Sequence, residues 1–194
     1  MYVDDLITTG SEQSEIDDFK REMKARFCMS DLGLLTYYLG IEVEHGRDAI
    51  MLRQSSYARK LVERGGLSGC KPCQTPMEEK IKLSKESTAE KADTTQYRSI
   101  IGGLRYLTQT RPDIMFAVGY LGRFMEDPRG DHSAAIKKLL RYVAGTIGYG
   151  IVNPRRRGAR LELTGFSDSD MARDVDGRKS TTGVLFFLDG CPIS

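Results

Sequence analysis

The sequence contains no tryptophan, only two histidines and no long apolar stretch. A helix that crosses a bilayer needs roughly 20 consecutive, mostly apolar residues, and no segment approaches that length. The N-terminus also lacks a basic region followed by an apolar one, because Asp4 and Asp5 interrupt its only apolar run. We therefore expect an intracellular protein with no secretion signal and no transmembrane segment.

Cysteine is scarce as well, since 194 residues contain only four, which are Cys28, Cys70, Cys73 and Cys191. This number is too small and too scattered for a disulfide framework, so we expect reduced thiols. Cys70 and Cys73 have the spacing of a zinc or redox motif. Zinc would need two further ligands, and a thioredoxin-like motif opens a helix, whereas Pro76 soon follows and favours extended chain. A thiol oxidoreductase is a remote alternative.

The formal net charge is only +2, but the basic residues are unevenly distributed. The segment 133–160 contains seven basic residues and no acidic one: Lys137, Lys138, Arg141, Arg155, Arg156, Arg157 and Arg160. Such a segment suits contacts with the phosphates of a nucleic acid. The alternative is a solvated helix face followed by a basic loop.

Periodicity along the first 76 residues predicts a mixture of helices and a hairpin. Apolar residues recur at helical spacing from Ile16 to Phe27, which predicts an amphipathic helix with one buried stripe. Alternating residues on either side of Gly46 predict a β-hairpin over about 39–52. A short helix from about Ser56 should end at Gly65. The segment 77–96 is rich in Lys, Glu, Ser and Thr and predicts a linker.

The second half of the chain changes from a helical to an alternating pattern near Gly150. Three amphipathic segments predict a helical bundle over 97–150, with Pro112 in the first turn of the second helix. Alternation from Leu161 and the apolar run 184–188 predict strands, with a hairpin turn at Asp189 and Gly190. The sequence thus predicts an α+β fold divided into 1–76, a linker 77–96, a bundle 97–150 and strands in 151–194.

Two adjacent carboxylates, Asp4 and Asp5, follow Tyr2 and Val3. Adjacent carboxylates repel each other unless cations or solvent neutralise them. In two-metal phosphoryl transfer, carboxylates hold two Mg²⁺ ions roughly 4 Å apart. These four residues alone also suit an exposed turn.

The motif is the first of several blocks that together resemble the Pol polyprotein of copia-type retrotransposons. Further blocks follow in the expected order: 34–43, 70–77, 97–99, 104–107, 110–114, 165–170 and 178–183. The resemblance covers nearly the whole chain. It implies the C-terminal part of a reverse transcriptase palm in 1–76, a helical thumb and connection in 97–150, and the first strands of a truncated ribonuclease H in 151–194.

The same resemblance implies roles for individual residues. Asp4 and Asp5 match catalytic metal ligands of the polymerase, with Tyr2 near the primer end, and Asp168 matches the first metal-binding carboxylate of ribonuclease H. The implied cofactor is Mg²⁺, and the implied partners are an RNA template and an RNA–DNA hybrid. Asp170 and Asp174 match acidic positions to which we assign no catalysis. Met171 and Arg173 stand where the family usually has Trp and Gly.

On this resemblance, the polymerase site also needs a carboxylate and fingers from before Met1, and the nuclease site needs carboxylates from after Ser194. We therefore expect the chain alone to be inactive in both reactions. The alternative is a non-catalytic domesticated or relic protein that binds nucleic acid or protein through the bundle. Open sheet edges should pair with missing polyprotein segments or with another chain.

Overall fold

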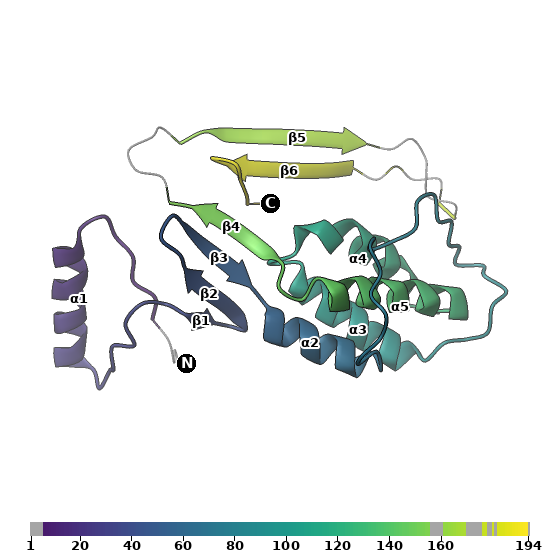
Figure 1. Ribbon diagram of the computed structural model, residues 1–194, viewed down its shortest axis with the longest axis horizontal. Coiled ribbons are helices and arrows are strands. Elements are labelled where there is room, and N and C mark those ends of the chain that lie inside the picture. Colours follow the sequence, from purple (N-terminus) through teal and green to yellow (C-terminus); the bar gives the residue numbers. More distant parts are fainter. Residues whose placement is uncertain (1–5, 156–160, 170–175, 178–179, 181, 194) are drawn as a thin grey trace.

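The computed structural model describes residues 6–155, 161–169, 176–177, 180 and 182–193. Figure 1 shows a helical bundle at one end, a twisted sheet in the middle and helix α1 (Gln13–Arg26) at the other end. A second sheet lies above the first. Among these residues there are five α-helices and two antiparallel sheets, which confirms the predicted α+β class.

The first sheet has four strands in the order β1-β2-β3-β4. Its centre is the predicted hairpin, formed by β2 (Ile41–His45) and β3 (Ala49–Arg53). The short strand β1 (Tyr37–Tyr38) pairs with β2 on one side. On the other side β3 pairs with β4 (Gly150–Pro154), with Leu52 opposite Ile151. Residues about 100 positions apart in the chain therefore complete one sheet.

The main core lies among four helices that bury one face each. They are α2 (Ser55–Arg64), α3 (Thr94–Leu107), α4 (Met115–Leu121) and α5 (Gly130–Gly145). The predicted end of α2 is confirmed, since Gly65 caps it. Pro112 opens a short 3₁₀ turn, η1 (Pro112–Ile114), which leads directly into α4, and a second turn, η2 (Gly122–Phe124), follows α4. Leu61, Leu104 and Leu139 are almost fully buried where α2, α3 and α5 meet.

The segment 77–96 has few regular hydrogen bonds, but it lies against the bundle. Leu83 is buried, and its backbone N–H donates to the Tyr120 hydroxyl at 3.0 Å. The carbonyl of Ser84 lies 3.0 Å from Nε2 of the buried His132. The division of the chain into domains at this segment stays a prediction.

The second sheet has the order β5-β6-β7. Strand β5 (Leu163–Ser169) pairs along its whole length with β6 (Thr182–Leu188), and β7 (Cys191–Pro192) pairs with the end of β6. The predicted turn between β6 and β7 is confirmed, because Asp189 and Gly190 both have positive φ angles, as a type I′ turn requires. Every residue of β5 is exposed.

The prediction of a buried stripe on the first helix is wrong. No residue of α1 is buried, and Phe19 is 41% exposed. Figure 1 shows why, because α1 stands apart from the other elements. Periodicity revealed the apolar side of this helix but could not show whether another element covers it. Within the described residues, no helix combines the length and the apolar character that a membrane span requires.

Candidate nucleic-acid interface and carboxylate positions

Asp168 is the one predicted catalytic carboxylate that lies in a described element. It is exposed on β5, directly opposite Gly183 of β6. Tyr2, Asp4 and Asp5 lie outside the described residues.

The described residues do not bring a set of metal ligands to Asp168. In that part of the chain, no group of three or more His, Cys, Asp or Glu side chains is arranged to hold a metal ion. Two-metal phosphoryl transfer requires several convergent carboxylates. A single exposed carboxylate does not fit that requirement, so no catalytic step through Mg²⁺ follows from the described geometry.

The predicted basic residues of α5 lie opposite its buried side. Lys137 is exposed, whereas the Lys138 ammonium lies 3.0 Å from a carboxylate oxygen of Glu78. The Nε–H of Arg141 donates to the backbone carbonyl of Lys71 at 2.7 Å. Of these three basic residues, Lys137 alone makes no such contact with a described residue. An exposed ion pair such as Lys138–Glu78 contributes little stability.

The basic residues after β4 are only partly described, because Arg156 and Arg157 lie outside the described residues. The guanidinium of Arg155 donates to Nδ1 of His45 at 3.2 Å. Nε2 of the same ring lies 2.7 Å from the carbonyl oxygen of Leu35. Through these two contacts the His45 ring ties Arg155 to the end of the β2–β3 hairpin.

All four cysteines are free thiols. No helix begins between Cys70 and Cys73, whereas a thioredoxin-like motif opens a helix. The backbone between the two cysteines instead provides the carbonyl that binds Arg141.

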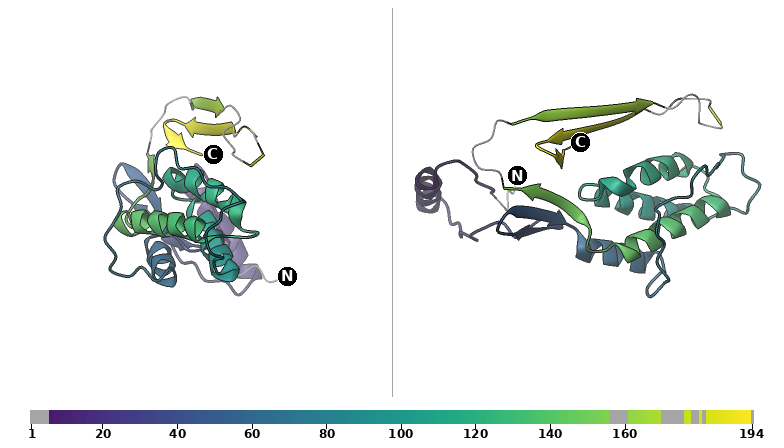
Figure 2. Two further views of the ribbon diagram at one scale, coloured as in Figure 1. Left: turned by 90° about the vertical axis from the view of Figure 1, so that its right-hand side faces the viewer. Right: turned by 45° about the horizontal axis from the view of Figure 1, so that its top comes forward.

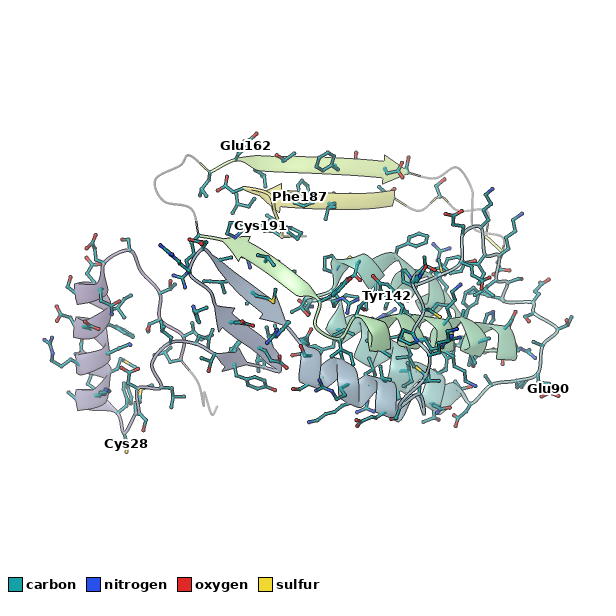
Figure 3. All side chains as sticks on the ribbon, viewed as in Figure 1. Cys28, Glu90, Tyr142, Glu162, Phe187 and Cys191 are labelled. Carbon is teal, nitrogen blue, oxygen red and sulfur yellow. The ribbon has the colours of Figure 1, made fainter. Side chains whose placement is uncertain are left out.

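Sequence reasoning missed a buried polar cluster around Arg111. This side chain is only 2% exposed, and its guanidinium binds both carboxylate oxygens of Asp113, at 2.8 and 2.7 Å. It also donates to the carbonyl and the hydroxyl of Thr146, at 2.9 and 2.8 Å. The rings of Tyr142 and Tyr149 lie 5.6 and 5.4 Å from the guanidinium carbon. Figure 3 shows Tyr142 near the junction of α5 and β4.

The charges of this cluster shift the pKa values of its members. Burial favours the protonated form of Asp113, but the hydrogen bonds and charge of Arg111, together with the Tyr142 hydroxyl, hold the pKa of Asp113 below its usual value. The pKa of Tyr142 is raised by burial and by the Asp113 carboxylate, to which its hydroxyl donates a hydrogen bond. An arginine two positions before an aspartate, directly ahead of the mostly apolar segment 114–121, was the available sequence signal. The cluster joins η1, α5 and the start of β4.

Comparison with known proteins identifies relatives over the whole chain. Residues 1–79 match the family model described as reverse transcriptase (RNA-dependent DNA polymerase). The uncharacterized mitochondrial protein AtMg00810 of Arabidopsis thaliana is 38% identical over 193 residues, covering all of this chain and 79% of that protein. The Pol polyproteins of transposon RE1 from Arabidopsis thaliana and TNT 1-94 from Nicotiana tabacum are 39% and 37% identical. The chain spans only 13% and 15% of these two polyproteins. No solved structure matches the chain significantly.

Proposed function

The chain belongs to the copia-type retrotransposon Pol family, and on this premise we propose that it is a section of an RNA-directed DNA polymerase with an adjoining ribonuclease H. The proposal is carried by one observation, which is that all of the chain aligns within Pol polyproteins while residues 1–79 match a reverse transcriptase. In the intact enzyme both reactions are phosphoryl transfers assisted by two metal ions.

The proposed polymerase residues are Asp4 and Asp5 as metal ligands, with Tyr2 beside the primer end. The proposed nuclease residue is Asp168. Its place on a strand, with the carboxylate exposed, supports a role as one ligand of a shared metal site. Mg²⁺ and the RNA–DNA hybrid belong to the proposal for the intact enzyme, whose remaining ligands the described residues do not provide.

We therefore expect the purified chain to be inactive by itself. The test is incorporation of a labelled nucleotide on a primed RNA template with Mg²⁺, beside release of fragments from a labelled RNA–DNA hybrid. The D4N/D5N variant controls for contaminating polymerase and D168N for contaminating nuclease. Incorporation that the wild-type chain supports and D4N/D5N abolishes would overturn the expectation.

A second function, binding of nucleic acid without catalysis, is favoured by the position of the basic residues on α5. Its buried side holds Ile136 and Leu139, whereas Lys137 is exposed, and Lys138 and Arg141 are partly buried beside Glu78 and the Lys71 carbonyl. Phosphate contacts are electrostatic and need no catalytic geometry. In this alternative the chain binds a hybrid duplex through the exposed side of α5, and Arg155, Arg156 and Arg157 extend the contact.

The measurement is the affinity for an RNA–DNA hybrid over a range of salt concentrations. Removing one phosphate contact by Lys137→Gln should weaken binding several-fold and lower the slope of log affinity against log salt by roughly one. Lys24→Gln is the matched control, because Lys24 is an exposed lysine on α1, at the opposite end of the molecule (Figure 1). Equal effects of the two substitutions, or affinity independent of salt, would exclude this interface.

A further inference from the structure

Two contacts that lie far apart attach the second sheet to the rest of the molecule. β7 lies beside β4, where the Cys191 thiol approaches the carbonyl of Val152 at 3.8 Å. Beyond the other end of β6, the described part of the segment between β5 and β6 lies beside the bundle (Figures 1 and 2) and binds it through Asp176. The seven residues of β6, roughly 23 Å of strand, separate the two places. A sheet held at both places is fixed in orientation, whereas a sheet held at β7 alone can turn.

Asp176 binds a turn formed by residues 84–87. Its carboxylate accepts hydrogen bonds from the Ser84 hydroxyl at 2.5 Å and from the Lys85 backbone N–H at 2.9 Å. The Ser84 hydroxyl oxygen itself accepts the Glu86 backbone N–H at 3.1 Å. The bonds from Ser84 and Lys85 hold the pKa of Asp176 below its usual value, although this side chain is exposed. The turn therefore presents convergent donors to one carboxylate.

A buried histidine of α5 holds the opposite side of this turn. The ring of His132 is inaccessible to solvent and stacks on Phe124 at 4.0 Å between centroids. Its Nδ1 accepts the backbone N–H of Arg129 at 3.0 Å, and because that group can only donate, the ring proton is on Nε2. Nε2 therefore donates to the Ser84 carbonyl, which lies 3.0 Å away.

The turn is thus preformed on its buried side and open to solvent on the side that binds Asp176. Leu83, just before the turn, is buried, and its N–H donates to the Tyr120 hydroxyl. A preformed site binds its ligand without a large further loss of conformational entropy. Exposed hydrogen bonds open more readily than buried ones. The contact should therefore open between Asp176 and the turn, while the turn stays on the bundle.

We propose that the turn 84–87 is a latch that fixes the second sheet against the bundle, with His132 as its positioning residue. Asp176 closes the latch, and His132 acts on it through the Ser84 carbonyl without a contact to Asp176 itself. The purpose of this latch rests on the proposed function. Where a polymerase and a nuclease act on one hybrid, a closed latch sets the distance between the two parts.

The test is hydrogen exchange of the Lys85 amide, followed by NMR in the full chain without nucleic acid. This N–H loses its acceptor only when the latch opens, so its exchange rate reports the open fraction. Asp176→Asn should speed the exchange by between about twofold and tenfold, because the acceptor loses its charge. Glu86→Gln is the matched control, since it removes an exposed neighbouring carboxylate that does not bind this amide. Its effect on the rate should be much smaller.

Two substitutions of His132 separate its contact with Ser84 from its packing. His132→Asn is too short to reach the Ser84 carbonyl and should speed exchange of the Lys85 amide by a similar factor. His132→Gln places an amide N–H near the position of Nε2 and should restore slow exchange. Both variants lose the stacking on Phe124. Exchange at the buried Ile101 of α3 reports unfolding of the bundle and should change equally in both.

A double-mutant cycle completes the test. His132→Asn should add little to Asp176→Asn, because both substitutions open the same latch. Additive effects, equal Lys85 exchange in the two His132 variants, or a rate that Asp176→Asn leaves unchanged would each overturn the proposal. These measurements involve neither nucleotide incorporation nor hybrid cleavage, so a failure of the latch is distinguishable from a failure of the proposed function.

Discussion

The buried pair of Arg111 and Asp113 makes the sharpest stability prediction. Asp113→Asn preserves the shape of the side chain but removes the charge that balances a guanidinium only 2% exposed to solvent. Removing one partner of a buried ion pair costs about 3–5 kcal/mol, because the other charge stays buried. Asp113 is itself 35% exposed, and solvent reaches the site, so we expect about 3 kcal/mol, the lower end of that range.

The assay is urea unfolding followed by circular dichroism, with thermal unfolding beside it. For a chain of this length, a loss of about 3 kcal/mol lowers Tm by roughly 6–12 °C. Glu78→Gln is the matched control, since it breaks the exposed ion pair to Lys138, in which the Glu78 side chain is 64% exposed. This control should cost no more than about 1 kcal/mol. A double replacement of Arg111 and Asp113 by apolar residues should cost less than Asp113→Asn alone.

The pH dependence of the free energy of unfolding provides an independent check on the same pair. The pKa of Asp113 is lower in the folded protein than its ordinary value of 3.8. The stability that this carboxylate contributes is therefore complete above pH 3.8 and is lost as the pH falls through the lower, folded value. The wild type and Asp113→Asn should converge in stability in that acidic range. A cost no larger than that of Glu78→Gln, or a difference that persists unchanged through the acidic range, would refute the reasoning.

Three further substitutions follow from the packing. Gly102 lies inside α3 with open space around it, so Gly102→Ala should raise the free energy of unfolding by about 0.4–1 kcal/mol, measured by urea titration. Gly150→Ala should instead lower Tm by several degrees, because its Cβ would collide with the backbone carbonyl of Leu52; an unchanged Tm would contradict this. Asp176, between β5 and β6 in the sequence, accepts hydrogen bonds from the Ser84 hydroxyl and the Lys85 N–H, at 2.5 and 2.9 Å. Asp176→Asn should weaken these contacts, so hydrogen exchange should become faster in β5 and β6 while α3 stays protected.

Local patterns in the sequence predicted the elements that depend mainly on neighbouring residues. The hairpin of β2 and β3, the end of α2 at Gly65 and the turn at Asp189 were all predicted from residues within a few positions of each other. Turn chemistry and helix capping depend on neighbouring residues, so sequence suffices for them. The sequence blocks likewise predicted the family, because their residues and their order can be read directly along the chain.

The pairing of β3 with β4 and the burial of Arg111 depend on contacts between distant segments. Nothing near Gly150 indicates that β4 will complete the sheet of β2 and β3. Nothing near Arg111 indicates that Thr146 and two tyrosines will enclose it. Each of these contacts joins segments that lie far apart in the sequence and come together only when the chain folds. Neighbouring residues therefore carry no pattern that would predict them.

The candidate site divides in the same way. Residue type and family resemblance nominated Asp168 and the basic residues of α5 directly from the sequence. Only the tertiary structure decided that Asp168 stands on an open edge, that Glu78 and the Lys71 carbonyl engage Lys138 and Arg141, and that the stripe of α1 is uncovered. Side-chain chemistry is a property of each residue, whereas exposure and partners are properties of the packed chain, and they determine which of those residues can act.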